Sequence, residues 1–434
     1  MSSILIIHRL CVLFGPKVRG INNSNMTPLF LAVFSLIAAF FLWLLIEWAI
    51  RYINGQHVHI PFVYRQPGLF YPIKYHFFRF ILWLRKRQNE RKQQHKLASS
   101  ADAGYGVRSR NSPDDMDKLQ VLPKEEPLAV DAVYFNGGNS SGVFLVAATA
   151  RRQDNIVQTI LYIRLPNIGL LEITSLPDTH LTGTDNGSSY SAGGLTITPV
   201  KPMDTWNLKF DGIMRIAETR EKVNVKFDLV WKAITKPFDF DTDLHPHVMA
   251  DGIARERWSR QYFDTLKRAH QTHYEQFGEI VGVVHVSGHP DQEVKVQGVR
   301  DHSYGNIRDW KLFHRYVLNY VHLEDGTSLC VGAISMPLTV SRLVVGYVFH
   351  PDGSMDSVSS TDFEFFNWGD ETEPPDKLIL KFTAGNKTYN LMSTKIQCPV
   401  FYMGQDWDAK IYERFCNYLV NGVKGWGISE WDYR

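Results

Sequence analysis

From about residue 128 to the end of the chain, apolar positions fall in short runs that turn residues interrupt. A first series covers residues 142–150, 157–164, 169–175, 195–200, 206–210, 212–217 and 223–234. A second covers residues 279–287, 293–299, 311–322, 328–334, 343–349, 378–383, 389–395 and 411–419. Turn signals such as Asn136-Gly137-Gly138 and Asp211-Gly212 separate the runs. This pattern predicts a mainly β fold, a sandwich or barrel, rather than alternating strands and helices.

One stretch between the two series has a helical period. Between residues 254 and 277, aromatic and apolar side chains recur every four residues amid Arg, Lys and Glu: Trp258, Tyr262, Leu266, His270 and Tyr274. The spacing predicts an amphipathic helix that plugs or flanks a sheet. The expected architecture is therefore two β units in tandem, residues 128–250 and 279–434, joined by a helix over residues 251–278.

The N-terminal part of the chain contains one long apolar segment. Residues 28–50 carry a single charge, Glu47, and place Trp43 and Trp48 near their C-terminal end. About 20 apolar residues suffice to cross a bilayer as a helix, and Trp favours the headgroup region. We expect a transmembrane helix after a tail of residues 1–27. The alternative, a cleaved signal peptide, requires a shorter apolar core and a small-residue cleavage site.

Basic and aromatic residues are mixed in the segment that follows, residues 51–96. Phe77, Phe80 and Trp83 run into Arg85, Lys86 and Arg87, a composition that predicts an interfacial helix for anionic lipid heads. Including this basic run in the charge balance favours a cytosolic C-terminal part of a single-pass protein, for example of the endoplasmic reticulum. Glycosylation motifs such as Asn139 leave the lumenal alternative open. Residues 97–127 lack apolar periodicity and predict a mobile linker.

Composition excludes several classes of protein. The chain has 434 residues, 44% hydrophobic, with a formal net charge of +2, so its size suggests two or three units and nothing indicates a nucleic-acid surface. Cys11, Cys330, Cys398 and Cys416 show no CxxC spacing, and no HExxH pattern occurs. We therefore expect no disulfide framework, no metal site and no cofactor. The expected partners are a membrane and an apolar small molecule or lipid, and no nucleic acid.

The densest chemistry lies in residues 300–310, where charged and aromatic side chains sit between apolar runs. A hairpin that turns at Tyr304-Gly305 would oppose Arg300 to Asp309 and Asp301 to Arg308, placing one ion pair on each face of the ribbon. The segment is then either a structural ion-pair lattice or a polar site in a ligand pocket. Asp301 and His302 face opposite ways in a strand, so they could serve one substrate atom only in a turn.

If either Asp301 or His302 is catalytic, general acid catalysis on an alkene or ketone suits it best. An apolar pocket raises the pKa of a carboxyl, and an acid neighbour can hold an imidazolium. The candidate ligand-binding residues around them are Arg300, Tyr304, Arg308, Asp309, Trp310 and Trp206, although both tryptophans are also natural core anchors. Glu430 could pair with Arg300 or Arg308, or face solvent.

Three segments carry a resemblance to a known group of proteins: Gly298-Val-Arg300-Asp301-His302-Ser303-Tyr304-Gly305 followed by Arg308-Asp309-Trp310, Trp206-Asn-Leu-Lys-Phe210-Asp-Gly212, and Gly425-Trp426-Gly427-Ile-Ser-Glu430. The chain resembles, over residues 130–434, the tandem lipocalin-like (calycin-type) proteins that include hydroxyneurosporene synthases, which are carotenoid hydratases, and AttH-like proteins. It is also similar to fungal lipocalin-like Diels-Alderases. The segment around Asp301 is the specific one.

The resemblance implies two closed or nearly closed β-barrels, with an apolar ligand held inside a barrel or in a cleft between them. Two hypotheses follow. One is a membrane-anchored protein that binds a lipid or isoprenoid-like molecule; the other is a hydratase, isomerase or cyclase that uses Asp301 or His302 as the general acid. A Gly-rich phosphate loop is not found in the sequence, so we expect no kinase-type chemistry.

Overall fold

The computed structural model describes residues 33–46, 49, 63–93, 112–185, 188–368 and 373–433. Contacts divide the chain into two units, residues 1–56 and 57–434, which we describe separately. In the first unit, residues 33–46 form a helix whose apolar side chains are largely exposed. Within the described ranges we find no helix with both the length and the apolar character needed to cross a bilayer. The expected span, residues 28–50, lies partly outside those ranges. Residues 1–27, 51–62 and 94–111 lie wholly outside them.

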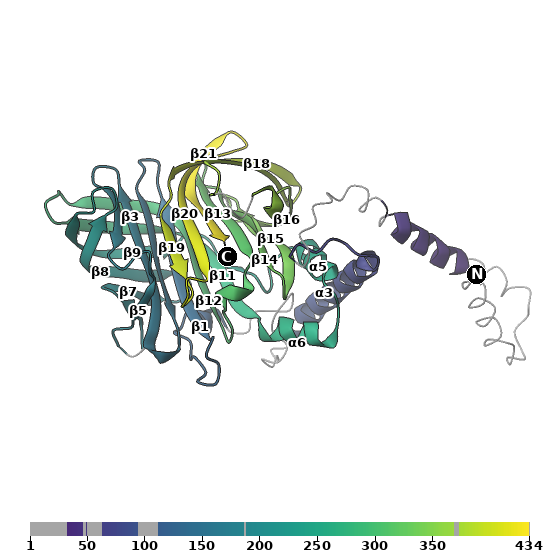
Figure 1. Cartoon of the computed structure of the whole chain (residues 1–434). Coiled ribbons are helices and arrows are strands. Elements are labelled where there is room, and N and C mark those ends of the chain that lie inside the picture. Colours follow the sequence, from purple (N-terminus) through teal and green to yellow (C-terminus); the bar gives the residue numbers. More distant parts are fainter. Residues whose placement is uncertain are drawn as a thin grey trace, which may run out of the picture. The chain divides into compact units, whose positions relative to one another are not determined.

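Eight strands of the second unit close into a first barrel (Figure 1). Around the ring they are β11 (Gln271–Val286), β12 (Gln292–Gly305), β1 (Val130–Gly138), β2 (Phe144–Arg151), β3 (Ile156–Leu165), β4 (Gly169–Ile173), β8 (Thr205–Ile216) and β9 (Lys222–Ala233), and β9 pairs back to β11. Four short strands extend this sheet: β5 (His180–Thr182), β6 (Tyr190–Ala192), β7 (Leu195–Lys201) and β10 (Phe238–Asp239).

A second ring of eight strands follows in sequence. It contains β13 (Arg315–Leu323), β14 (Ser328–Met336), β15 (Val340–Phe349), β16 (Met355–Thr361), β17 (Lys377–Ala384), β18 (Lys387–Gln397), β20 (Ala409–Val420) and β21 (Val423–Tyr433). Antiparallel pairing of β18 with β20 closes it, and β19 (Val400–Met403) adds to β20. The expected mainly β architecture of two barrels in tandem is confirmed.

Burial patterns show which sides of the barrels face each other. Strands β8 and β9 alternate buried and exposed residues, as expected when one face meets the barrel interior and the other meets water. Strands β1, β2 and β13, in contrast, are buried at nearly every position. Their outer faces are covered as well, because the two barrels pack together there; Phe144 on β2, for example, stacks on Phe415 of β20 at 5.1 Å.

The helical prediction for residues 254–277 is only partly right. Helix α5 (Pro246–Arg255) ends before Glu256, whose backbone is extended, and Ser259 caps a separate helix, α6 (Arg260–Arg268). From Gln271 the chain is strand β11, because β10, β9 and β12 offer it a ladder of backbone hydrogen bonds. The same period of four apolar and aromatic residues therefore spans a helix and a strand.

The predicted boundary of the second β unit at residue 279 is also wrong. Strands β11 and β12 pair with β9 and β1 and complete the first barrel, so the second barrel begins at Arg315. Strands that follow each other in the sequence usually pair, as β11 and β12 do. The order of strands along the chain does not show which barrel such a hairpin belongs to.

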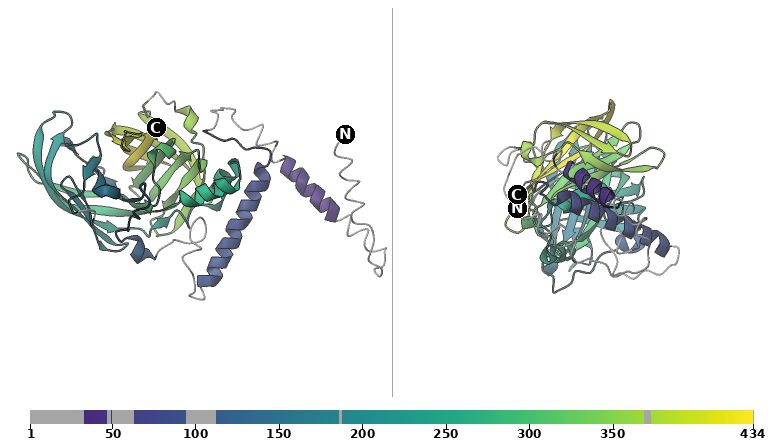
Figure 2. Two further views of the ribbon diagram at one scale, coloured as in Figure 1. Left: turned by 60° about the horizontal axis from the view of Figure 1, so that its bottom comes forward. Right: turned by 90° about the vertical axis from the view of Figure 1, so that its right-hand side faces the viewer.

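The remaining helical elements lie outside the rings. Helix α3 (Tyr71–Gln93) lies against α5, as the two views of Figure 2 show. Short turns of helix are α4 (Pro113–Met116), η2 (Gln153–Asn155), η3 (Trp310–Leu312) and η4 (Phe365–Asn367). Although residues 97–127 were expected to be a mobile linker, the described part, residues 112–127, carries Asp117, which is almost fully buried in the first barrel.

Candidate functional site

A cavity of about 270 Å³ lies between the two barrels. Strands β1, β2, β11 and β12 of the first barrel form one wall, and β13, β14, β20 and β21 of the second form the other. The volume is close to the lower end of the range for small-molecule sites, about 300 to 1,000 Å³. The ligand cavity that the resemblance implies therefore has a counterpart in the cleft between the barrels.

Apolar side chains line most of this cavity. Because side chains alternate along a strand, Ala132 of β1 and Ala148 and Ala150 of β2 all point out of the first barrel, and their small size leaves the space open. The opposite wall carries larger and more flexible side chains, including aromatic rings and thioethers. They are Trp310, Phe313, Leu318, Ile334, Met336, Leu343, Phe401, Met403 and Ile411. Such a lining suits an apolar ligand of irregular shape.

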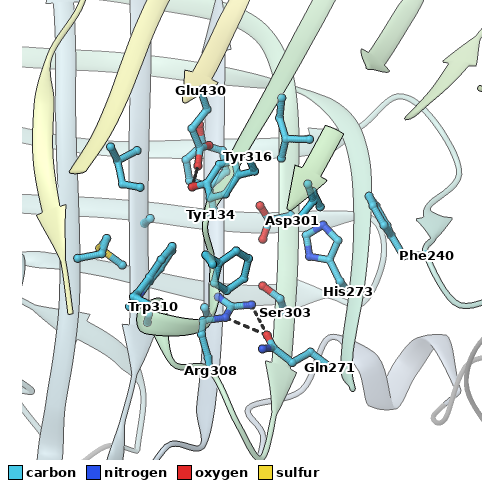
Figure 3. A pocket seen from close by; sticks show the side chains of 18 of the residues that line it. Tyr134, Phe240, Gln271, His273, Asp301, Ser303, Arg308, Trp310, Tyr316 and Glu430 are labelled. Carbon is cyan, nitrogen blue, oxygen red and sulfur yellow. Dashed lines mark hydrogen bonds between the residues drawn. The ribbon is translucent and has the colours of Figure 1, made fainter. Parts of the chain in front are cut away.

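Asp301 projects into this cavity from β12 (Figure 3). Its carboxyl accepts no hydrogen bond and forms no ion pair with any residue that the structure describes. Burial raises the pKa of Asp301 to about 6, and the nearby His273 charge only partly opposes that effect. An unpaired carboxyl in an apolar surrounding can hold a proton near neutral pH, which is the state required of a general acid.

A second carboxyl of the cavity, Glu430 of β21, does have a partner. The Tyr316 hydroxyl donates a hydrogen bond to it, as Figure 3 shows. Burial is the main reason that the pKa of Glu430 is raised to about 7; the Tyr316 hydrogen bond opposes this, and the charge of Asp301 adds to it. Asp301 and Glu430 therefore disfavour each other's ionisation across one cavity.

Two further carboxyls, those of Glu413 and Glu275, lie beside Asp301 and Glu430, and we call these four acids with their partners the acid cluster. Tyr134 donates to Glu413, and burial raises the pKa of Glu413 well above its ordinary value. Glu275 lies 3.2 Å from the His273 ring, Oε1 to Nε2, and accepts from the Tyr320 hydroxyl at 3.3 Å. Glu275, Glu413 and Glu430 each accept a hydrogen bond from a tyrosine, whereas Asp301 accepts none from a described residue.

The cluster contains two basic groups. Arg308 donates from Nε and Nη2 to Gln271 Oε1, at 2.9 and 2.6 Å, and has no ion-pair partner among the described residues. Burial lowers the pKa of His273, but its hydrogen bond to Glu275 and the charge of Asp301 outweigh burial, and the net shift is upward. Both groups line the cavity and can donate hydrogen bonds to a ligand oxygen.

The hairpin predicted for residues 300–310 does not form. Strand β12 ends at Gly305, and Arg300 and Asp301 lie opposite Gln276 and Glu275 of β11 rather than Asp309 and Arg308. The reason is that β1 and β11 flank β12 on both sides, so no edge is left for a local partner. Neither crossed ion pair exists in the structure.

The candidate residues accordingly separate into three places. Asp301, Arg308 and Trp310 line the cavity. Arg300, His302, Tyr304 and Trp206 project to the other face of the sheet, into the first barrel. Asp309 caps η3, accepting from the Lys311 backbone N–H at 2.9 Å. The strand argument that Asp301 and His302 face opposite ways is confirmed, and only Asp301 reaches the cavity.

His302 belongs to a buried network inside the first barrel. Its Nε2 lies 2.6 Å from Asp131 Oδ1, and its Nδ1 lies 3.0 Å from the Tyr274 hydroxyl. Arg300 binds both oxygens of Asp117, at 2.8 and 3.0 Å, and lies over the Trp206 ring at 5.3 Å. Since both ring nitrogens of His302 are occupied by protein partners, this network braces the barrel and fastens residues 112–120 to it.

Sequence reasoning did not single out several residues in or beside the cavity. His273 and Glu275 lie in the stretch that predicts a helix, Tyr316 lies in a predicted strand, and Tyr134 lies in none of the predicted runs. The usable signal was the polar run Gln271-Thr-His-Tyr-Glu-Gln276 directly before an apolar strand. No three His, Cys, Asp or Glu side chains gather as a metal site in the described ranges.

Solved structures with a similar fold include an AttH-like protein from Nitrosomonas europaea, at 10% identity and TM-score 0.44, covering 73% of this chain and 96% of that one. Kievitone hydratase from Nectria haematococca is 11% identical at TM-score 0.41, covering 76% and 97%. CghA is 10% identical at TM-score 0.43, covering 77% and 95%. The TM-scores lie between 0.41 and 0.44, so these likenesses are reported as similarities only. With identities this low, no activity is carried over from them.

No curated protein matches the sequence. One family does match, over residues 37–433, which include both barrels, α3 and most of the first unit's helix. It is described as a family of unknown function, DUF8627, and the chain belongs to it.

Proposed function

We propose that the cavity between the barrels binds an apolar small molecule and that Asp301 exchanges a proton with it. The observation that carries this proposal is the unpaired Asp301 carboxyl, with its pKa raised to about 6, in a cavity of about 270 Å³ lined mostly by apolar groups. A carboxyl that is desolvated without a partner costs stability, and such a group in a cavity is a candidate functional residue.

The chemistry that fits is acid–base catalysis without a cofactor: hydration, isomerisation or cyclisation of an alkene or carbonyl compound. In a hydration, the Asp301 proton forms a bond to one alkene carbon. Water then adds to the other carbon, and the proton that the water loses returns to the Asp301 carboxylate. Arg308 and His273 are placed to donate hydrogen bonds to a ligand oxygen.

The second candidate function is ligand binding without chemistry, as a carrier of an apolar molecule. The tyrosine hydrogen bonds to Glu413, Glu430 and Glu275 favour it, because they show that most acids of the cluster are braced rather than presented to a ligand. Membrane anchoring and a lipid ligand are further parts of this candidate, and both need separate tests.

Deuterium exchange tests the two candidates against each other. The purified full chain is incubated in deuterium oxide with an organic-solvent extract of the cells that express it. Bound molecules are then analysed by native mass spectrometry. We expect a recovered ligand that carries deuterium at carbon or has gained water, at a rate that falls as pH rises through about 6 because Asp301 loses its proton. Asp301→Asn should still bind the ligand but leave it unlabelled. A ligand that wild type releases unchanged selects the carrier, and failure of folded protein to capture any ligand contradicts both candidates.

Filling the cavity should abolish binding. Ala148→Phe places a ring in the space that the small side chain leaves open, and we expect the affinity for a captured ligand to fall by about tenfold or more. Val230→Phe is the matched control, since Val230 is exposed on β9 and does not line the cavity. Binding to the full chain is measured by native mass spectrometry, and thermal unfolding checks that both variants are folded. Equal affinity in Ala148→Phe and wild type would show that the ligand lies elsewhere.

A further inference from the structure

Helix α3 has two apolar faces, and only one of them is covered. Tyr71, Tyr75, Phe78 and Leu82 are buried on the side that meets α5. On the opposite side, Ile73, Phe77, Phe80 and Leu84 repeat at spacings of four, three and four residues and remain exposed, and Phe70 just before the helix continues the row. We call this row, together with the exposed Trp83, the outer stripe.

The outer stripe has a fixed direction because α3 is fastened to α5. The Tyr71 hydroxyl donates to Asp251, and the Tyr75 hydroxyl lies 2.7 Å from Nδ1 of His247. Lys74 Nζ donates to the carbonyls of Ala254 at 3.2 Å and Glu256 at 2.5 Å, at the end of α5. The helix cannot roll to bury the outer stripe without breaking these bonds.

Basic side chains border the outer stripe. Arg79, Arg85, Lys86 and Arg87 are exposed along the helix, and the Arg87 guanidinium lies over the Trp83 ring at 4.4 Å. The sequence of α3 contains one acid, Glu90, against seven Lys and Arg residues. A row of Phe, Ile, Leu and Trp with basic residues at its sides is the arrangement of a helix that lies in the plane of a membrane surface.

We propose that the outer stripe of α3 inserts into the headgroup region of an anionic lipid bilayer. Charge complementarity selects this occupant. A second copy of the chain would bring Arg79, Arg85, Lys86 and Arg87 against the same residues, and like charges repel. Phosphatidylserine headgroups carry the opposite charge.

The docked orientation also has a consequence for the cavity. Helix α5, on which α3 rests, contributes Met249 to the cavity wall. With α3 docked on the membrane, α5 would stand between the membrane surface and the cavity wall. An insoluble ligand would then have a short path from the membrane to the cavity. The docking proposal itself does not depend on any ligand or reaction in the cavity.

Photocrosslinking at the outer stripe tests the proposal. p-Benzoylphenylalanine is placed at Phe80, which is 53% exposed, in the full chain bound to phosphatidylcholine vesicles that contain about 30 mol % phosphatidylserine. We expect lipid adducts at position 80 at roughly ten times the yield of the control or more. The control places the same group at Ile379, a 74% exposed residue on β17 of the second barrel.

A charge variant shows whether anionic lipid is what the helix recognises. In R85Q/K86Q/R87Q we expect the adduct yield at position 80 to fall several-fold and to become independent of the phosphatidylserine content. Three outcomes would overturn the proposal: a crosslink from position 80 to residues 33–46, a crosslink to a second copy of the chain, or a lipid yield no greater than at position 379. Because these side chains are exposed, loss of folding is not the expected cause of any of them.

Discussion

Replacing Asp301 by Asn should stabilise the folded protein at pH 8 by about 2 to 3 kcal/mol and leave its stability at pH 4 nearly unchanged. Burial raises the pKa of Asp301 to about 6 in the folded state, against about 3.9 in an unfolded chain. Between these two values the folded protein holds a proton that the unfolded chain has lost. Stability from this group is therefore fully present below about pH 4 and is lost as pH rises through about 6.

The measurement is urea unfolding of wild type and Asp301→Asn at pH 4, 6 and 8, with the difference between the proteins taken at each pH. Asp264→Asn, which removes an exposed carboxyl on α6, is the control, and its effect should stay within about 0.5 kcal/mol at every pH. If Asp301→Asn and wild type lose stability in parallel from pH 4 to pH 8, the Asp301 carboxyl is not desolvated by the cavity. The premise of the proposed proton exchange would then fail.

Replacing Arg300 by Met should destabilise the first barrel by about 3 to 5 kcal/mol. Arg300 is almost fully buried, binds both oxygens of Asp117 and Oε1 of Gln276, and lies between the rings of Trp206 and Trp231. Removing the guanidinium leaves the Asp117 carboxylate buried without its cation, which is the costly half of breaking a buried ion pair.

Unfolding in urea gives the size of this effect, and limited proteolysis near residues 112–120 reports whether that segment detaches. Lys226→Met is the control, because its ion pair with Asp211 at 2.8 Å is solvent-exposed and should contribute little to stability. The double variant Arg300→Met/Asp117→Asn should recover much of the lost stability, since no uncompensated charge remains. A loss in Arg300→Met no larger than in Lys226→Met would show that the network does not brace the barrel.

The two predictions concern the two faces of one strand. Arg300 and His302 lie on the inner face of β12, where every charge has a partner and the effect is structural. Asp301 and Ser303 lie on the outer face, where a cavity separates the barrels. Strand β12 therefore carries a structural network on one face and a candidate site on the other, because side chains alternate along a strand.

Hydrophobic periodicity and turn residues were enough to predict the features that depend on neighbouring positions in the sequence. Short apolar runs between turn residues predicted a mainly β fold in two series, and the period of two along a strand showed that Asp301 and His302 could not share one substrate atom. The amphipathic composition around Phe77, Phe80 and Trp83 predicted a helix there, and α3 covers these residues. These inferences needed no knowledge of which segments meet.

Every error came from pairing between distant segments. Residues 271–277 repeat polar and aromatic types at a helical spacing, but the backbone hydrogen bonds offered by β9, β10 and β12 make them a strand. Residues 300–310 were expected to pair with themselves, whereas β1, some 160 residues earlier, occupies that edge. The linker at residues 112–127 is ordered because Asp117 meets Arg300.

The sequence by itself determined the fold class, the tandem arrangement, the apolar N-terminal segment and the importance of the segment around Asp301, because alternation, turn residues and composition act over a few neighbouring positions. Only the tertiary structure decided that Asp301 stands unpaired in a cavity while His302 is braced inside a barrel. The same holds for Glu430, Tyr316 and His273, which join Asp301 from three other strands. A raised pKa depends on burial and on charges brought together by folding, and neither quantity is encoded in any short stretch of residues.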